Sequence, residues 1–300
     1  MQLLGYIIAY PLLWLVSRLP FRLLYLLSDG VYFLVYRVFG YRKKVVRGNL
    51  KLVFPEKSQK EILSIEKKFY RHLCDMFLEM IKTMNMTNEK MLGRFHVTNP
   101  ELINGYAANN QSAVLLAGHY ASWEWLLGIN TKLAPKAIAI YQKVNNKYFD
   151  NLVKRIREKF GTTLIRTNES REIIAKMADK QQTFVLGIAS DQSPMLNRQR
   201  HWAEFMGIKV PIHVGGEQLC KAHNLIPIFL RVRKLKRGHY EASFEVLFEN
   251  PQKIPDYEIS EAFMDKLEEC IREAPEYYFW THKRWKHRDK IPAELQKAKA

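Results

Sequence analysis

The sequence predicts an α/β protein with a mainly parallel sheet flanked by helices, preceded by an apolar N-terminal helix. Short apolar segments of strand length alternate with segments of helical periodicity through most of the chain. Such alternation is typical of a parallel sheet with helices on both faces. The first 40 residues differ, because they are apolar almost throughout.

The N-terminal segment indicates contact with a membrane. Leu3 to Val16 is uncharged, but a helix of this length reaches only about 21 Å, short of the ~30 Å hydrocarbon core. A cluster of basic residues follows, which favours the cytoplasmic side and anionic headgroups. The cluster consists of Arg37, Arg42, Lys43, Lys44 and Arg47. We expect a membrane anchor over residues 1–40, dipping or spanning, and one α/β domain over residues 41–300. The alternative is a buried helix pair of a soluble protein.

The composition limits the partners. Lys and Arg number 47 against 30 Asp and Glu, a net charge of +17, which favours a phospholipid surface, a phosphorylated substrate, a nucleic acid or an acidic protein. The three cysteines are too few and too far apart for a disulfide framework or a Cys-x2-Cys metal pair. A reducing cytosolic environment fits best, and we expect no metal and no bound cofactor.

The remaining elements are predicted from periodicity and breakers. A long amphipathic helix over residues 58–84 is interpreted as packing alone. Further helices are predicted at 101–109, 146–160, 171–180 and 260–272, and strands at 95–100, 113–117, 137–141, 162–166, 183–189, 225–232 and 240–248.

One strand leads directly into a candidate catalytic residue. Residues 113–117 form an apolar run typical of a buried strand, and Gly118 ends it. Residues 120–128 are predicted to be a helix. His119 therefore lies where a central strand ends and a helix begins, which is where open α/β sheets bind ligands.

His119 and Glu124 are a candidate acid–base pair. On an uninterrupted helix, residues five apart point about 140° away from each other, but a turn at His119 would let the two side chains meet. A carboxylate that accepts from one imidazole nitrogen fixes the tautomer and makes the other a better base. The sequence has no Gly-x-Ser-x-Gly elbow and no nearby cysteine. The pair suggests a base that acts on a substrate hydroxyl without a covalent intermediate. The alternative is a capping histidine and a solvated glutamate.

Three other polar segments are candidates for a functional role. Asp191 follows a predicted strand and is either a second carboxylate behind the site, a substrate acceptor or a turn residue. The basic segment 231–239 is ordinarily solvated, but could dock an acidic protein. Residues 276–288 place aromatic next to basic side chains, which could stack on bases, seat a phosphate headgroup or form an edge segment.

Together these features resemble the bacterial late acyltransferases of lipid A biosynthesis, the lauroyl and myristoyl transferases, within the glycerolipid acyltransferase superfamily. The resemblance covers nearly the whole chain. The matching motifs are the apolar N-terminus followed by basic residues, Gly118-His119-x4-Glu124, Tyr141…Asn146…Phe149-Asp150…Arg155, Asp191-Gln192-Ser193-Pro194, and Glu276-x-Tyr278-x-Trp280-x-His282-x-Arg284-Trp285-Lys286. Gln142 and Lys143 depart from the family, which usually has Arg after the tyrosine.

The resemblance implies an O-acyltransferase on the cytoplasmic face of a bacterial inner membrane. His119 would be the general base and Glu124 would orient it. Lys143, Arg155 or a backbone N–H could stabilise the oxyanion, and Asp191 and Arg284 would also contact substrate. Acyl carrier protein would be the donor and a lipid A precursor the acceptor.

Two alternatives stay open. The acceptor could be a lysophospholipid or an aminolipid. A basic membrane-surface or nucleic-acid-binding protein without catalysis would explain the charge and the aromatic C-terminus, but not a buried strand that ends in His-x4-Glu. Nucleic acid is therefore not expected as a partner.

Overall fold

The computed structural model describes residues 2–198 and 200–292, and the remainder of the predicted α/β domain, residues 293–300, lies outside them. A seven-stranded sheet in this part of the chain has the order β1-β9-β8-β2-β5-β3-β4. Its strands are β1 (Phe95–Val97), β2 (Ala113–Ala117), β3 (Lys136–Tyr141), β4 (Thr163–Arg166), β5 (Phe184–Ala189), β8 (Ile226–Lys236) and β9 (His239–Val246). All neighbours are parallel except β8 and β9, which form an antiparallel hairpin. The predicted α/β class is confirmed.

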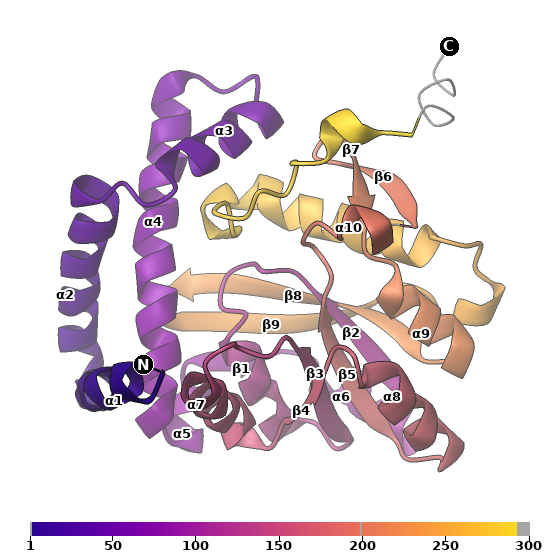
Figure 1. The fold of residues 1–300 in the computed structure, drawn as a ribbon. Coiled ribbons are helices and arrows are strands. Elements are labelled where there is room, and N and C mark those ends of the chain that lie inside the picture. Colours follow the sequence, from indigo (N-terminus) through magenta and orange to yellow (C-terminus); the bar gives the residue numbers. More distant parts are fainter. Residues whose placement is uncertain (1, 199, 293–300) are drawn as a thin grey trace.

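Helices surround this sheet (Figure 1). They are α1 (Gln2–Arg18), α2 (Phe21–Tyr32), α3 (Lys43–Val53), α4 (Gln59–Lys82), α5 (Asn88–Leu92), α6 (Pro100–Ala108), α7 (Lys147–Arg157), α8 (Ser170–Asp179), α9 (Gly215–His223) and α10 (Glu258–Glu273). Short 3-10 helices include η3 (Trp125–Lys132) and η4 (Glu158–Phe160), and a separate antiparallel pair consists of β6 (His201–Phe205) and β7 (Ile208–Ile212).

The centre of the sheet places the candidate site. Every residue of β2 is buried, and β2 lies between β5 and β8. Ala117 at the end of β2 pairs with Ala189 at the end of β5, and the Ser190 N–H still donates to the Ala117 carbonyl. Because parallel strands end at the same edge, this register brings His119 and Asp191 next to each other.

The N-terminal segment is not the single anchor helix that the sequence predicted. It breaks after α1, and continues as α2 and a π-helical turn, η1 (Phe33–Val38). Pro20 has no N–H and disfavours a helical conformation for the residue before it. The Lys82 ammonium donates to the freed carbonyls of Ser17 and Leu19. Within residues 2–198 and 200–292, no single helix is long and apolar enough to cross a membrane, although the bent pair 21–38 and 43–53 is by length and composition.

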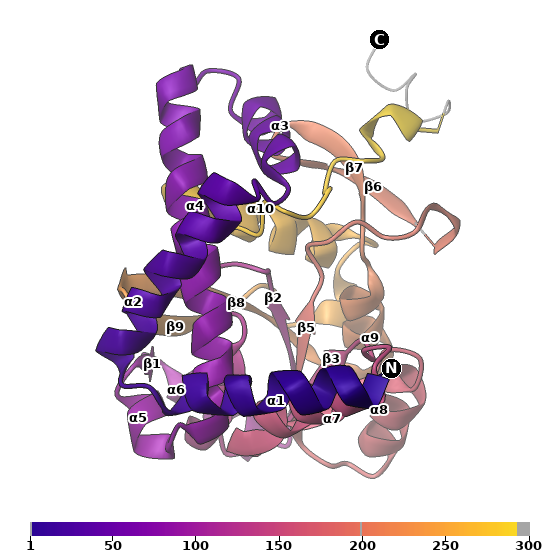
Figure 2. The same ribbon diagram turned by 60° about the vertical axis from the view of Figure 1, so that its left-hand side comes forward.

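The apolar side chains of this segment are largely on the outside. Helices α1 and α2 lie together on one side of the molecule against α4 (Figures 1 and 2). A buried helix pair would cover its large apolar side chains, yet Phe39 is 76% exposed and Ile8 69%. The exposed large apolar residues of this region are Leu3, Leu4, Ile7, Ile8, Leu12, Trp14, Leu15, Leu23, Leu26, Leu27, Phe33, Leu34, Val38, Phe39 and Tyr41.

Candidate active site

A turn, and not the predicted helix, follows His119. Tyr120 forms an isolated antiparallel bridge with Tyr278, and Ala121 has φ +49°, in the left-handed region that ends helical winding. Helical structure begins only at Trp125. A side chain at Gly118 would have to displace Leu267, because a Cβ at this position would lie 2.5 Å from Leu267 Cδ1.

Asp191 is the carboxylate that bonds to His119. Its Oδ1 lies 2.7 Å from His119 Nδ1, and the residue is only 1% exposed. An ionised carboxylate can only accept, so Nδ1 carries the proton and Nε2 presents its lone pair. Burial alone would lower the pKa of His119, but the charge of Asp191 and this hydrogen bond outweigh it and raise the pKa above 6.5. Burial opposes ionisation of Asp191 too, and His119 holds its pKa below 3.8.

An amide lies next to Nε2 of His119, and two aromatic rings lie near the imidazole. The Gln192 side-chain nitrogen lies 3.3 Å from His119 Nε2. The ring centroids of Trp123 and Phe279 lie 5.5 Å and 6.1 Å from the centroid of the imidazole ring. The His119 side chain is still 23% exposed, so a ligand can approach it.

Glu124 does not hydrogen-bond to His119, contrary to the orienting contact predicted from the sequence. It accepts two bonds from the Arg157 guanidinium, at 2.6 Å and 3.1 Å. The turn at residues 120–124 replaces the helix on which the prediction depended, and Arg157 at the end of α7 pairs with the carboxylate. Its remaining effect on His119 is electrostatic, because its charge helps to raise the pKa of the imidazole.

The two basic residues predicted to stabilise the oxyanion do not contact His119. Arg155 donates to the hydroxyl of Tyr6, which is on α1, at 3.2 Å. Residues two apart on a helix point about 200° from each other, so Arg157, which the sequence analysis missed, faces the site instead. Lys143 is exposed in the loop after β3, and in the described part of the chain no hydrogen bond or ion pair joins it to His119.

Arg284, which the resemblance predicts to contact substrate, is fully buried near Asp191. Its guanidinium lies over the Phe205 ring, 5.3 Å from the centroid, and has no hydrogen-bond partner within the described residues. Burial lowers its pKa, while Tyr278 and Asp191 act in the opposite direction. Its charge therefore acts on Asp191 from the protein interior.

The aromatic C-terminal segment is part of the core. Tyr278, Trp280 and Trp285 are all buried, so they cannot stack on nucleic-acid bases as one interpretation of the sequence allowed. The Ser193 N–H donates to His282 Nε2 at 3.2 Å, and burial lowers the pKa of His282 to about 4. The segment thus supports the turn that carries Asp191.

A basic groove of about 510 Å³ lies between α3 and the end of this segment. It is lined by Lys44, Val45, Gly48, Asn49, Lys51, Leu52, Lys283, Trp285, Lys286 and Arg288. Five of these residues are basic and none is acidic, so the groove favours an anionic ligand.

The fold and the site define an α/β protein with a buried carboxylate paired to a histidine at the carboxyl edge of a parallel sheet. Residues 2–287 match the sequence profile of the bacterial lipid A biosynthesis acyltransferases, and the chain belongs to this family. It is therefore an acyltransferase, as the sequence motifs indicated.

Named relatives agree with this family. The chain is 24% identical over 284 residues to a lipid A biosynthesis lauroyltransferase of Escherichia coli K12, covering 92% of this chain and 89% of the relative. It is 23% identical over 278 residues to a palmitoleoyltransferase of the same pathway and organism, and to a lipid A biosynthesis acyltransferase of Shigella flexneri, with the same coverage of 92% and 89%.

Proposed function

We propose that this protein transfers a fatty acyl chain from the thioester of acyl carrier protein to a hydroxyl of a lipid A precursor. The observation that carries the proposal is the bond between His119 Nδ1 and the buried Asp191, which puts the proton of the neutral imidazole on Nδ1 and the basic lone pair on Nε2, in a member of the lipid A acyltransferases.

In the proposed reaction, His119 Nε2 takes the proton of the acceptor hydroxyl while the oxygen attacks the thioester carbonyl. Asp191 accepts from Nδ1–H and stabilises the imidazolium that forms. The tetrahedral intermediate then expels the thiolate, and the imidazolium returns its proton to sulfur. The Gln192 amide donates to Nε2 in the unliganded site, and we propose that it donates to the oxyanion once the acceptor hydroxyl takes its place at Nε2. Glu124, which bonds to Arg157, acts on His119 only through its charge.

The basic groove is the proposed docking surface for the donor, because acyl carrier protein is acidic. Charge reversal in Lys44→Glu with Lys51→Glu is expected to raise KM for the acylated carrier on the order of 10-fold and to leave kcat unchanged. Steady-state kinetics against acyl carrier protein and against acyl coenzyme A measure this effect, which should be larger for the protein donor.

The matched control for the groove is Lys176→Glu with Lys180→Glu, the same change of charge at exposed positions on α8 and directly after it. An equal rise in KM in both double variants would show that the groove does not bind the donor. A rise in KM of the groove variant that is the same for acyl carrier protein and for acyl coenzyme A would show this too.

The exposed apolar side chains of α1, α2 and η1 are the proposed membrane contact. Helices α1 and α2 lie on one side of the molecule (Figure 2), and Arg18, Arg22 and Arg37 are exposed along this segment. Because the segment is broken at Pro20, we propose that it lies in the headgroup region of the inner leaflet, on the cytoplasmic face of the inner membrane. Residues 1–40 would thus bring the α/β domain to its lipid acceptor.

The double substitution Ile8→Asp with Leu26→Asp is expected to weaken binding to vesicles of phosphatidylethanolamine and phosphatidylglycerol. Each substitution removes about 1.5 kcal/mol or more of the free energy gained when the apolar side chain is buried in the membrane. The partition coefficient should therefore fall about 10²-fold. Asn109→Asp with Gln252→Asp adds the same charge at exposed positions outside these helices. Co-sedimentation that is equal for both double variants would contradict the membrane contact.

An assay of the purified protein with acyl carrier protein charged with a fatty acid tests the proposed function. We expect acylation of a lipid A precursor and none of lysophospholipid. The opposite result would keep the chemistry and change the acceptor, and no transfer to any lipid would contradict the proposal.

A further inference from the structure

A row of polar side chains on α4 is buried, although a helix face turned to the interior is normally apolar. His72, Asp75, Glu79 and Lys82 are each at most 7% exposed, and their spacing of three and four residues puts them on one face. The apolar periodicity of this helix predicts packing alone, so these polar residues are unexpected. Buried charges of this kind require partners.

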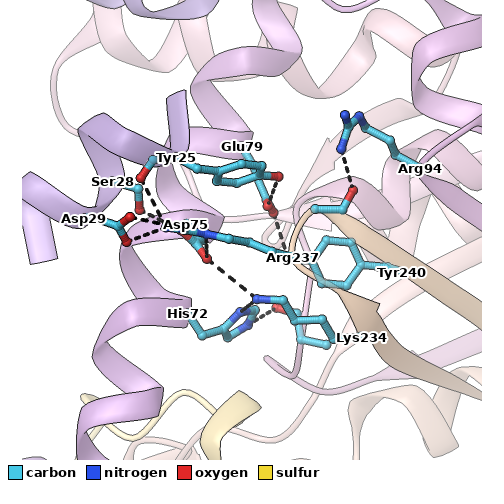
Figure 3. A network of polar contacts seen from close by, with 12 residues as sticks. Tyr25, Ser28, Asp29, His72, Asp75, Glu79, Arg94, Lys234, Arg237 and Tyr240 are labelled. Carbon is cyan, nitrogen blue, oxygen red and sulfur yellow. Dashed lines mark hydrogen bonds and ion pairs between the residues drawn. The ribbon is translucent and has the colours of Figure 1, made fainter. Parts of the chain in front are cut away.

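Two elements supply the partners of Asp75 and Glu79 (Figure 3). From α2, Ser28 Oγ donates to Asp75 at 2.7 Å and the Tyr25 hydroxyl donates to Glu79 at 2.9 Å. From the β8–β9 hairpin, Arg237 donates to Asp75 at 2.7 Å, and the Tyr240 hydroxyl donates to Glu79 at 2.8 Å. The interpretation of segment 231–239 as solvated is therefore wrong for Lys234, which is buried, while Arg237 stays partly exposed.

Lys234 extends this cluster to His72. Its side chain is 9% exposed and its ammonium lies 3.7 Å from Asp75 Oδ2 and 3.1 Å from His72 Nδ1. An ammonium can only donate, so His72 Nδ1 accepts and His72 Nε2 carries the proton. Burial, with the charge of Lys234, lowers the pKa of His72 well below 6.5, so the imidazole is neutral.

The Nε2–H of His72 points at the turn that carries the catalytic histidine. Its nitrogen lies 3.2 Å from the carbonyl oxygen of Ala121, which is two residues after His119 and fully buried. Ala121 adopts φ +49°, and its own N–H donates to the Tyr277 carbonyl at 2.9 Å. A residue with a Cβ holds such a conformation only where its surroundings fix it. Both backbone polar groups of Ala121 are fixed here.

We propose that His72 is a positioning residue for acyl transfer: Lys234 holds it as the Nε2–H tautomer, and its bond to the Ala121 carbonyl sets the His119 imidazole against Asp191. The proposal rests on the proposed function of His119 as the base. A displacement of about 1 Å in a reacting group can cost about 10²-fold in rate. His72 thus acts on the reaction through the turn and does not touch substrate.

Three variants test the tautomer and the bond. His72→Leu removes both nitrogens, and is expected to lower kcat about 10- to 100-fold with KM within about 3-fold of the wild type. His72→Gln places an amide N–H near the position of Nε2 and is expected to restore kcat to within about 5-fold. Lys234→Met, which frees the tautomer, is expected to lie between them.

The matched control is Ser28→Ala, which removes one hydrogen bond from the same cluster without touching His72. It is expected to lower the melting temperature with kcat unchanged. Equal kcat for His72→Leu and His72→Gln, or loss of kcat in proportion to melting temperature across all four variants, would overturn the positioning role. If His72→Leu does not fold, the contrast between His72→Gln, Lys234→Met and Ser28→Ala decides the question.

A second measurement does not depend on the acceptor lipid. In NMR titrations of the full chain with labelled histidine, the pKa of His119 is expected to fall towards 6.5 in Lys234→Met and to stay at the wild-type value in Ser28→Ala. An unchanged pKa in Lys234→Met would overturn the proposal. If His119→Ala kept full activity while this pKa moved, the base assignment would fail and the positioning of the turn would stand.

Discussion

Replacement of His119 by alanine is expected to lower kcat by about 10²- to 10⁴-fold, because general-base catalysis by a positioned side chain supplies a factor of this size. The His119 imidazole lies at the carboxyl edge of the sheet and bonds to Asp191 through Nδ1, so its Nε2 is the nitrogen that can take the proton. Turnover of acylated carrier protein by the purified variant measures the loss.

His96→Ala is the matched control for this substitution, because His96 is an exposed histidine on β1. It should have the wild-type rate. A His119→Ala protein with a rate within a few-fold of the wild type would remove His119 from the mechanism.

Replacement of Asp191 by asparagine should have the next largest effect, about 10²- to 10⁴-fold in kcat. An asparagine amide can donate to Nδ1, which would move the proton to Nε2 and abolish the base; in a serine protease triad the same substitution costs about 10⁴-fold. The comparison with Glu124→Gln is informative, because Glu124 bonds to Arg157 and affects His119 by charge alone. We expect Glu124→Gln to lose much less. A larger loss in Glu124→Gln than in Asp191→Asn would reverse the assignment.

The pH dependence gives an independent check on Asp191. His119 must be neutral to act as a base, and its pKa is raised above 6.5, so the acidic limb of kcat/KM should lie above pH 6.5 in the wild type. In Asp191→Asn the residual activity should show this limb at lower pH, because the opposing effect of burial remains. A limb that does not move would contradict the pairing.

The shifted pKa values of Asp191 and His119 also make the stability of the fold depend on pH, in opposite directions for the two residues. The pKa of Asp191 is lowered by folding, so its carboxylate stabilises the fold above about pH 3.8, and this contribution is lost as the pH falls through the folded value. The pKa of His119 is raised, so its contribution is present below about pH 6.5 and is lost as the pH rises through the folded value.

The sequence was sufficient to find the strand that carries His119, because an apolar run ended by glycine is a local signal. The strand register is not local. Asp191 could be recognised only as polar after a strand, and its contact with His119 depends on the pairing of Ala117 with Ala189. Glu124 was assigned on the assumption of a helix after His119. The bridge from Tyr120 to Tyr278, distant in sequence, replaced that helix.

Charge was harder to interpret than hydrophobicity. Arg155 and Arg157 are two residues apart, and only the packing of α7 shows which one faces Glu124. The sequence also gave no sign that Lys234 and Arg237 are neutralised by α4 and α2, because their acidic partners lie far away in the chain. The β6–β7 pair and α9 were missed, since their apolar residues follow neither period for long.

The most direct test of acyl transfer to lipid A is mass spectrometry of lipid A from cells that lack this gene and its paralogues, carrying either the wild-type gene or His119→Ala. We expect one acyl chain to be missing without the gene, restored by the wild type and not by the variant. Unchanged lipid A in the deletion strain, or restoration by His119→Ala, would contradict the proposed function or the proposed base, respectively.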